Sequence, residues 1–289
     1  MRIVHISDIH VGKLSLSWRA LFDKRLLGTA NWLVRRASLF HREYFDRALT
    51  EIHRLSPELV VCTGDVTCVS APREFEMAAK MLEPLRVAFG HRFLFIPGNH
   101  DAYVRDAACQ KALKECFWKL NSQRWELGDL PLELNQGGLR IFLLNEAAPA
   151  SWWLSTGRLQ PEAAEWLAQR ATPRRPLNEQ RLLVGHFPVR RADGSLLPAR
   201  RRLQGGETID NLLREGRIDL ALCGHVHHPF VRREPGGGTE VCAGSLTLNG
   251  VLNVVDWHPG EGRFRQFFVD VSQVEPPTSP VGDSVAAVS

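Results

Sequence analysis

Residues 96–101 have the sequence Ile96-Pro97-Gly98-Asn99-His100-Asp101, and they directly follow the apolar run Phe93-Leu94-Phe95. The apolar run predicts a short buried strand, which ends at the proline and glycine because both residues weaken strand pairing. The next three side chains are of types that bind metal ions or transfer protons. A single tetrapeptide of this kind is weak evidence for a functional site, so its significance depends on whether the pattern recurs.

Four further segments repeat the layout, in which a short apolar strand ends in His or Asp. Ligands bind outside the carboxyl ends of the strands in open α/β sheets, so five such strands could deliver these side chains to one edge. A glycine precedes the polar residue in several segments and lets the backbone turn sharply there. The four segments are residues 2–10 with Asp8 and His10, 59–65 with Asp65, 182–186 with His186, and 220–227 with His225 and His227.

Apolar periodicity between and after these segments predicts the remaining elements. In the first half of the chain strands alternate with helices, whereas the end is rich in strands. This order favours an α/β fold with two sheets packed face to face and helices outside. The expected helices cover residues 43–55, 72–89, 106–120, 161–171 and 206–215, and the further strands cover 139–145, 239–245, 251–257 and 263–271.

Composition restricts the class of protein and its compartment. The net charge of +4 is too small to indicate a nucleic-acid partner. The six cysteines form no CxxC pair, which favours a reduced chain without a disulfide framework. No apolar run is long enough to span a bilayer, and the chain starts with a strand instead of a signal peptide. We therefore expect a cytoplasmic protein with one domain over residues 1–272 and a disordered tail over 273–289.

Two segments leave alternatives open. Residues 13–42 mix large apolar and basic side chains, which fits a packed helix, a lid over the site, or an amphipathic element on the inner membrane surface. The basic loop 187–206 is either an ordinary solvated loop or a rim that binds phosphate. In the second case, Arg190 and Arg191 are the predicted substrate-binding residues.

Together the polar strand ends supply two carboxylates, one amide and four imidazoles. Mixed oxygen and nitrogen ligands without thiolate suit divalent Mn, Fe, Zn or Co. The set is too large for one tetrahedral site and fits two divalent ions that share a carboxylate. In a two-metal hydrolase of this kind, a hydroxide held between the ions attacks the substrate, so no protein nucleophile is needed.

The series Asp8-x-His10, Gly64-Asp65, Gly98-Asn99-His100-Asp101, Gly185-His186 and Gly224-His225-x-His227 resembles the motifs of the calcineurin-like metallophosphoesterase family. The blocks occur in the same order over roughly residues 1–230. The resemblance implies a four-layer α-β-β-α sandwich with a dinuclear metal site at the carboxyl-terminal edge of the strands. It implies one metal bound by Asp8, His10, Asp65 and His227, and a second bound by Asp65, Asn99, His186 and His225.

The resemblance also implies roles for the two residues that follow Asn99. His100 is expected beside the leaving-group oxygen as a proton donor instead of a metal ligand. Asp101 is expected either to orient His100 or to cap the following helix. Both are therefore predicted catalytic residues.

The same resemblance implies a phosphohydrolase for phosphodiester or pyrophosphate bonds, with a small phosphodiester or a lipid nucleotide as substrate. Bacterial cyclic-nucleotide phosphodiesterases are similar in length and motif order, but many carry Arg soon after the Gly-Asn-His-Asp motif, where this chain has Ala102-Tyr103-Val104-Arg105. Hydrolases of UDP-2,3-diacylglucosamine, which act in lipid A synthesis, are similar in residues 24–36. A non-catalytic scaffold is a third alternative, which the unbroken motifs disfavour.

Overall fold

The computed structural model describes residues 1–12, 40–151, 153–171, 179–258 and 263–274. Of the segment 13–42, only residues 40–42 are therefore described, and its expected role as helix, lid or membrane contact stays a prediction. The expected tail over 273–289 lies outside the described residues except for its first two positions. The domain bounds 1–272 likewise stay a prediction.

The first sheet contains both ends of the described chain. Its strands β1, β2 and β3 are parallel neighbours, so their carboxyl ends lie at one edge, and β12 pairs antiparallel with β1. The strand order is β13 (Arg263–Asp270), β12 (Val251–His258), β1 (Arg2–Ile6), β2 (Leu59–Cys62) and β3 (Phe93–Phe95).

The second sheet is formed by the middle of the chain. Strands β5, β7, β9 and β11 are parallel, while β4 and β10 pair antiparallel at the two edges. The order is β10 (Phe230–Arg233), β11 (Thr239–Cys242), β9 (Leu220–Cys223), β7 (Gln180–Val184), β5 (Leu139–Leu143) and β4 (Leu132–Gln136). A separate two-stranded sheet joins β6 (Gly157–Arg158) to β8 (Leu203–Gln204).

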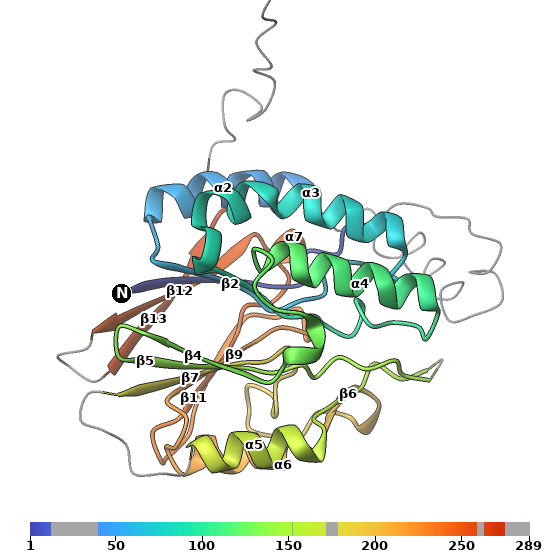
Figure 1. Cartoon of the computed structure of the whole chain (residues 1–289). Coiled ribbons are helices and arrows are strands. Elements are labelled where there is room, and N and C mark those ends of the chain that lie inside the picture. Colours follow the sequence, from blue (N-terminus) through green and yellow to red (C-terminus); the bar gives the residue numbers. More distant parts are fainter. Residues whose placement is uncertain (13–39, 152, 172–178, 259–262, 275–289) are drawn as a thin grey trace, which may run out of the picture.

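The helices cover the outer faces of the two sheets (Figure 1). Helices α2 (Arg42–Leu55), α3 (Pro72–Phe89) and α4 (Ala107–Leu120) pack on the first sheet. Helices α5 (Pro161–Ala171) and α6 (Glu207–Arg214) pack on the second. The order helix, sheet, sheet, helix confirms the four-layer sandwich. One-turn elements complete the chain: α7 (Leu246–Asn249), η3 (Gly90–Arg92), η4 (Leu127–Asp129) and η5 (Ala199–Arg201).

Strands β2, β3 and β9 are apolar throughout because they are buried on both faces. Successive side chains of a strand point to opposite faces. In β2, Val60 and Cys62 join the cluster under the helices, whereas Leu59 and Val61 join the cluster between the sheets. The same alternation places Trp257 of β12, 1% exposed, between the sheets.

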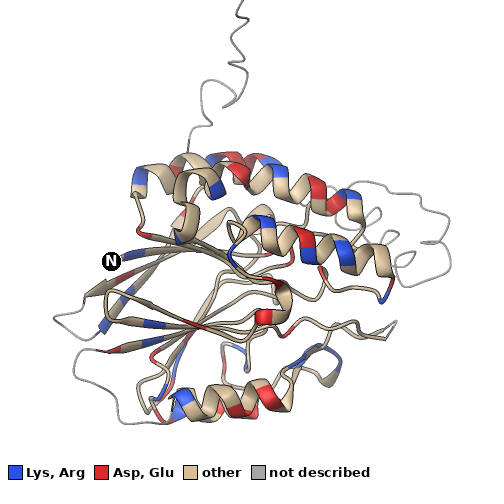
Figure 2. Cartoon of the chain, viewed as in Figure 1, with Lys and Arg blue, Asp and Glu red and all other residues tan. Residues whose placement is uncertain are grey.

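Charged residues of both signs lie along the outer helices, and few lie on the strands between them (Figure 2). Within the described residues, no helix is both long enough and apolar enough to cross a membrane.

The sequence did not predict the edge strands β4 and β10. Polar residues make up at least half of their sequences, LELNQ and FVRR, and their burial is mostly intermediate. Because these two strands are partly exposed, they tolerate polar side chains and lack the apolar run that predicts a buried strand. The expected strands 139–145 and 239–245 also end early, at Leu143 and Cys242, because the chain leaves the sheet before the last apolar residues.

The packing of α4 on the first sheet provides a stability test. Phe117 is fully buried and its ring centroid lies 6.3 Å from that of Phe95 in β3. We expect Phe117→Ala to lower the free energy of unfolding by about 3–5 kcal/mol, because it leaves a cavity. The adjacent Trp118 is 43% exposed, so Trp118→Ala should cost less than about 1 kcal/mol. Denaturant unfolding of both variants checks this; equal losses would contradict the packing.

Candidate metal centre

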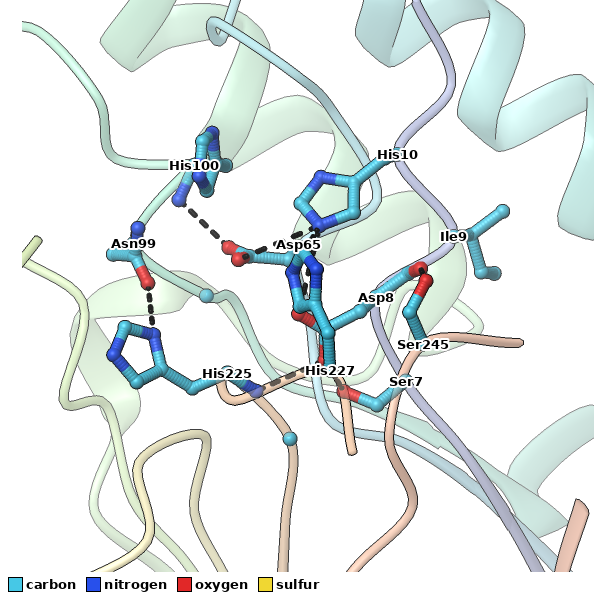
Figure 3. Close-up of polar contacts among 12 residues, drawn as sticks. Ser7, Asp8, Ile9, His10, Asp65, Asn99, His100, His225, His227 and Ser245 are labelled. Carbon is cyan, nitrogen blue, oxygen red and sulfur yellow. Dashed lines mark hydrogen bonds and ion pairs between the residues drawn. The ribbon is translucent and has the colours of Figure 1, made fainter. Parts of the chain in front are cut away.

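The polar residues predicted from the five strand ends meet at one edge of the two sheets. Asp8 and His10 follow β1, Asp65 follows β2, and Asn99 follows β3. His186 follows β7, while His225 and His227 follow β9 of the second sheet. Figure 3 shows side chains from both sheets directed toward one another around Asp65.

A first cluster joins Asp8, His10, Asp65 and His227, whose potential ligand atoms all lie within 4.8 Å of one another. Asp8 Oδ1 is 3.1 Å from His227 Nε2 and 3.5 Å from His10 Nε2. The two Nε2 atoms are themselves 3.0 Å apart. This is the ligand set that the resemblance implied for one metal.

A second cluster joins Asp65, His186 and His225 within the same 4.8 Å limit. His186 Nε2 lies 3.4 Å from Asp65 Oδ2. The side-chain oxygen of Asn99 lies 3.2 Å from His186 Nε2 and 2.8 Å from His225 Nδ1. Asp65 is therefore common to both clusters, at the place expected for a bridging carboxylate. The role of each residue as a ligand stays a prediction.

Backbone carbonyls fix the tautomers of three histidines. A carbonyl only accepts, so the ring nitrogen facing it must donate, and the other nitrogen of a neutral ring keeps its lone pair. That lone pair faces the clusters in each case. His10 Nδ1 donates to Thr67 at 3.2 Å, His186 Nδ1 to Thr63 at 2.5 Å, and His225 Nε2 to Arg201 at 3.1 Å.

The two carboxylates each keep one oxygen for a cation. Asp8 Oδ2 accepts from Ser7 Oγ at 2.6 Å and from the His225 N–H at 3.0 Å. Asp65 Oδ1 accepts from the His100 N–H at 2.7 Å. The other oxygens, Asp8 Oδ1 and Asp65 Oδ2, are buried and accept no hydrogen bond of acceptable geometry from the described residues. A buried carboxylate oxygen without a partner is costly, so the residues fit divalent cations between them.

The pKa shifts of Asp65 and His186 in the metal-free protein also indicate a site for cations. Burial opposes ionisation of Asp65, but the charges of His186 and His100 outweigh it and hold the pKa of this carboxyl below its usual range. Burial alone would lower the pKa of His186, yet the charges of Asp65 and Asp8 raise it to about 10. The site thus stabilises positive charge beside Asp65, and the same electrostatic attraction would favour a bound metal ion.

The backbone is strained at this edge of the sheets. Nine described residues other than glycine have a positive φ, and five of them are predicted ligands. Such left-handed conformations cost free energy in residues with a Cβ atom and concentrate at functional sites. The five are Asp8 at 53°, His10 at 49°, Asp65 at 53°, His225 at 70° and His227 at 59°.

One glycine of the motifs, Gly98, lies so close to its neighbours that no side chain fits there. A Cβ on Gly98 would lie 2.3 Å from Asp65 Oδ1 and 2.6 Å from His186 Cε1. Any larger residue at this position would therefore displace the shared carboxylate.

His100 is half-buried beside the clusters. Its Nδ1 donates to the Cys68 carbonyl at 2.6 Å. Its ring stacks on Tyr103, with centroids 5.3 Å apart and an angle of 14°. The ring also meets that of His10 edge-on at 5.0 Å. These contacts hold the ring against the metal centre, and Nε2 is the nitrogen that could serve a substrate.

The structure excludes one of the two roles expected for Asp101, the capping of the following helix. Its buried carboxylate accepts from the N–H groups of Val66, Thr67 and Gly98 and from the Thr67 hydroxyl. Asp106, and not Asp101, caps the first turn of α4, and the expected role of Asp101 in orienting His100 stays a prediction. Asp101 therefore ties the loop after β2 to the loop after β3, and burial together with the Asp65 charge raises its pKa to about 6.

The two predicted substrate-binding arginines lie in the loop after β7. Arg190 forms a bidentate ion pair with Asp210 of α6, at 2.8 and 2.7 Å, and donates to the Gly194 carbonyl. It lines a cavity of about 420 Å³ that also contains Arg214 and Arg233. Arg191 is exposed in the turn that starts this loop. The role of both residues in substrate binding stays a prediction.

Sequence reasoning missed one residue that supports the site. Glu146 is buried, and its Oε2 accepts from the N–H groups of His186 and Phe187 at 2.7 and 2.8 Å. Burial raises its pKa to about 7. The signal was present in the sequence, because Glu146 follows the apolar run that forms β5 in the same way as the metal ligands follow theirs.

Comparison with known proteins agrees with this geometry. The family model described as calcineurin-like phosphoesterase matches residues 1–229. A curated relative, the D component of the SbcCD nuclease of Staphylococcus epidermidis, is 23% identical over 239 residues, which are 80% of this chain. The chain spans only 58% of the length of that relative.

Solved structures share the fold. A dimetal phosphatase from Danio rerio has a TM-score of 0.59 and 14% identity, and the match covers 89% of this chain and 92% of that one. The purple acid phosphatase PPD1 from yellow lupin seeds has a TM-score of 0.58 and 11% identity, with 96% and 52% covered. At these identities the likeness concerns the fold alone.

The shared position of Asp65 gives a test of metal content. We expect Asp65→Asn to bind far less than one metal ion per chain, because it removes the anionic oxygen common to both clusters. Asp270 is exposed on β13, so Asp270→Asn should keep the wild-type content. Mass spectrometry of the metals after loading with Mn and desalting checks this. Full metal occupancy in Asp65→Asn would contradict the bridging role of Asp65.

Proposed function

Because the chain belongs to the calcineurin-like phosphoesterase family, we propose that this metal-dependent hydrolase cleaves phosphodiester or pyrophosphate bonds of small substrates. The metal ions, once bound, would supply Lewis-acid stabilisation of the phosphoryl oxygens and an activated water. One cluster of Asp8, His10, Asp65 and His227 and one of Asp65, Asn99, His186 and His225 would hold them. The metals we propose are Mn, Fe or Zn, which suit this mixed oxygen and nitrogen set.

The observation that carries the proposal is the shared Asp65 carboxylate. Its Oδ2 atom is buried without a hydrogen-bond partner among the described residues, and it lies 4.0 Å from His10 Nε2 of one cluster and 3.4 Å from His186 Nε2 of the other. No Ser, Thr or Cys nucleophile with an adjacent base is needed for hydrolysis at such a centre. The protein residues bind the ions, orient the phosphoryl group and move a proton to the departing oxygen.

His100 is the residue we propose for that proton transfer. The Cys68 carbonyl fixes its Nδ1–H, and the ring stacks on Tyr103. Nε2 is then the nitrogen that can deliver a proton to the leaving-group oxygen, as a general acid does. The Asp101 carboxylate would act indirectly, by joining the loops that carry Asp65 and His100.

Two specific observations favour larger substrates as second candidates. Residues 24–36 are similar to the hydrolases of UDP-2,3-diacylglucosamine, and apolar residues there could hold acyl chains. The segment would then also contact the inner membrane surface. The curated relative SbcCD is a nuclease by name, which makes a nucleic-acid phosphodiester the other candidate, although the net charge is only +4.

Turnover by the Mn-loaded protein tests the proposal with four substrates side by side. They are bis-p-nitrophenyl phosphate, p-nitrophenyl phosphate, UDP-2,3-diacylglucosamine in detergent and a single-stranded oligonucleotide. We expect the diester to be hydrolysed at least tenfold faster than the monoester. Cleavage of the monoester alone, or of no substrate with both metals bound, would overturn the proposal. Faster cleavage of the lipid nucleotide or the oligonucleotide would select the corresponding second candidate.

A second test concerns His100. We expect His100→Ala to keep the wild-type metal content and to lower kcat by about 10²–10⁴-fold, because it removes the proton donor and no ligand. The loss should be smaller for p-nitrophenolate, a good leaving group, than for an alkoxide, which needs a proton more. Steady-state kinetics with one diester of each kind measures this difference.

The matched control is His91→Ala, since His91 is an exposed histidine of η3. It should leave both rates within twofold of wild type. If His100→Ala lost metal in proportion to its rate, or lost equal activity on both leaving groups, the proton-donor role would be wrong.

A further inference from the structure

The two histidines of the first cluster are both in contact with one phenylalanine ring. The ring centroid of Phe40 lies 5.4 Å from that of His10, at an interplanar angle of 61°. It lies 6.4 Å from the centroid of His227, at 78°. The two imidazole centroids are 4.9 Å apart. The three rings therefore form a triangle in which Phe40 meets both imidazoles edge to face, an arrangement that aromatic rings favour.

The second cluster repeats this arrangement with Phe187. Its ring centroid lies 5.1 Å from that of His186, at 88°, and 4.3 Å from that of His225, at 42°. The two imidazole centroids are 5.5 Å apart. Within the described residues, neither phenylalanine has a ring contact with a histidine of the other cluster. Each cluster thus has a phenylalanine of its own.

Phe40 is held by the loop that carries the first two ligands. The N–H of the next residue, His41, donates to the Thr247 carbonyl at 2.7 Å. The Thr247 hydroxyl donates in turn to the carbonyl of Ile9, the residue between the two ligands that follow β1, at 2.9 Å. The backbone beside Phe40 is therefore tied to the loop whose histidine the ring contacts.

Phe187 is fixed more tightly, because it is only 3% exposed. Its N–H donates to Glu146 Oε2 at 2.8 Å. A Cβ atom added to Gly157 of β6 would lie 2.3 Å from Cε2 of the ring. The ring therefore lies directly on the backbone of β6 and has little room to tilt.

These contacts matter because the lone pair of an imidazole nitrogen lies in the ring plane, so metal affinity depends on the orientation of the ring. The hydrogen bonds to backbone carbonyls described above fix the tautomers of three histidines, and each of them restrains a single ring nitrogen. A contact against the side of the ring restrains its tilt as well. The two phenylalanines supply this second restraint without donating a ligand atom.

We propose that Phe40 and Phe187 are positioning residues, each of which orients the two histidines of its own cluster and so sets the affinity for one of the two metal ions. The inference rests on the proposed function, since it takes both clusters to be metal sites. It adds to that function a separate control of each site. A change at one phenylalanine should therefore weaken one metal ion and not the other.

Calorimetric titration with Mn²⁺, after removal of bound metal by a chelator, tests the inference in variants that keep a single site. We expect His225→Ala to keep the first site and His227→Ala to keep the second. Adding Phe40→Ala should raise the Kd for Mn at least tenfold in the His225→Ala background, because residues that orient a ligand change metal affinity by about 10–100-fold. In the His227→Ala background the Kd should stay within twofold.

Two further substitutions separate the aromatic contact from general packing. Phe40→Tyr keeps the ring, so its Kd should stay within twofold of the Phe40 protein in both backgrounds. Phe187→Leu is the milder change suited to a buried side chain. It should show the reverse pattern, with Mn binding at least threefold weaker in the His227→Ala background and unchanged in the His225→Ala background.

The matched control is Phe268→Ala, since Phe268 is 37% exposed on β13. It should keep the Kd within twofold in both backgrounds. Equal weakening of both sites by Phe40→Ala, no weakening of either, or an equal loss in Phe40→Tyr would each overturn the inference. If a single-site variant binds no Mn, the titration is decided with all ligands intact, where Phe40→Ala should weaken one of the two Mn ions at least tenfold and leave the other within twofold.

Turnover of bis-p-nitrophenyl phosphate by the Mn-loaded wild type keeps the two proposals apart. Normal diester turnover, together with unchanged Mn affinities in the phenylalanine variants, would overturn the positioning roles and leave the proposed function. No diester turnover by the wild type, together with a loss of affinity confined to one site in each variant, would do the reverse.

Discussion

One buried carboxylate links the parts of this structure. Asp65 shares its Oδ2 atom between two clusters of ligands, and this oxygen accepts no hydrogen bond within the described residues. Burying such a charge is unfavourable unless a cation compensates it. The surrounding histidines supply nitrogen lone pairs, and the strained backbone at Asp65 is tolerated because the neighbouring loops fix it. A bound metal ion would therefore compensate the buried charge of Asp65.

The two sheets are joined at the same place. Asp8 belongs to the loop after β1 of the first sheet, and its Oδ2 accepts from the backbone N–H of His225 after β9 of the second. Ser245 Oγ also donates to the Asp8 carbonyl, at 2.7 Å. These bonds set the distance between the ligands of the two sheets. The metal centre is thus a contact between layers, and the core between the sheets keeps it rigid.

We expect substrate choice to depend on other parts of the chain. The metal ligands come from strand ends, which have little freedom, whereas the loops after β5 and β7 can differ without disturbing the core. Here the loop after β7 brings the Arg201 carbonyl to Nε2 of His225, and the loop after β5 donates the Ser155 N–H to the Arg200 carbonyl.

The sequence by itself determined the central strands, their helices and the residues that meet at the sheet edge, because burial on both faces leaves long apolar runs and each ligand directly follows one. Only the tertiary structure decided which neighbours support that edge. The edge strands β4 and β10 were missed because they are half-exposed and polar. The Arg201 carbonyl could not be predicted, since every residue has one and only folding selects it. The backbone N–H donors of Asp101 could not be predicted either, because loop conformation, which short motifs do not encode, decides where a buried carboxylate finds its donors.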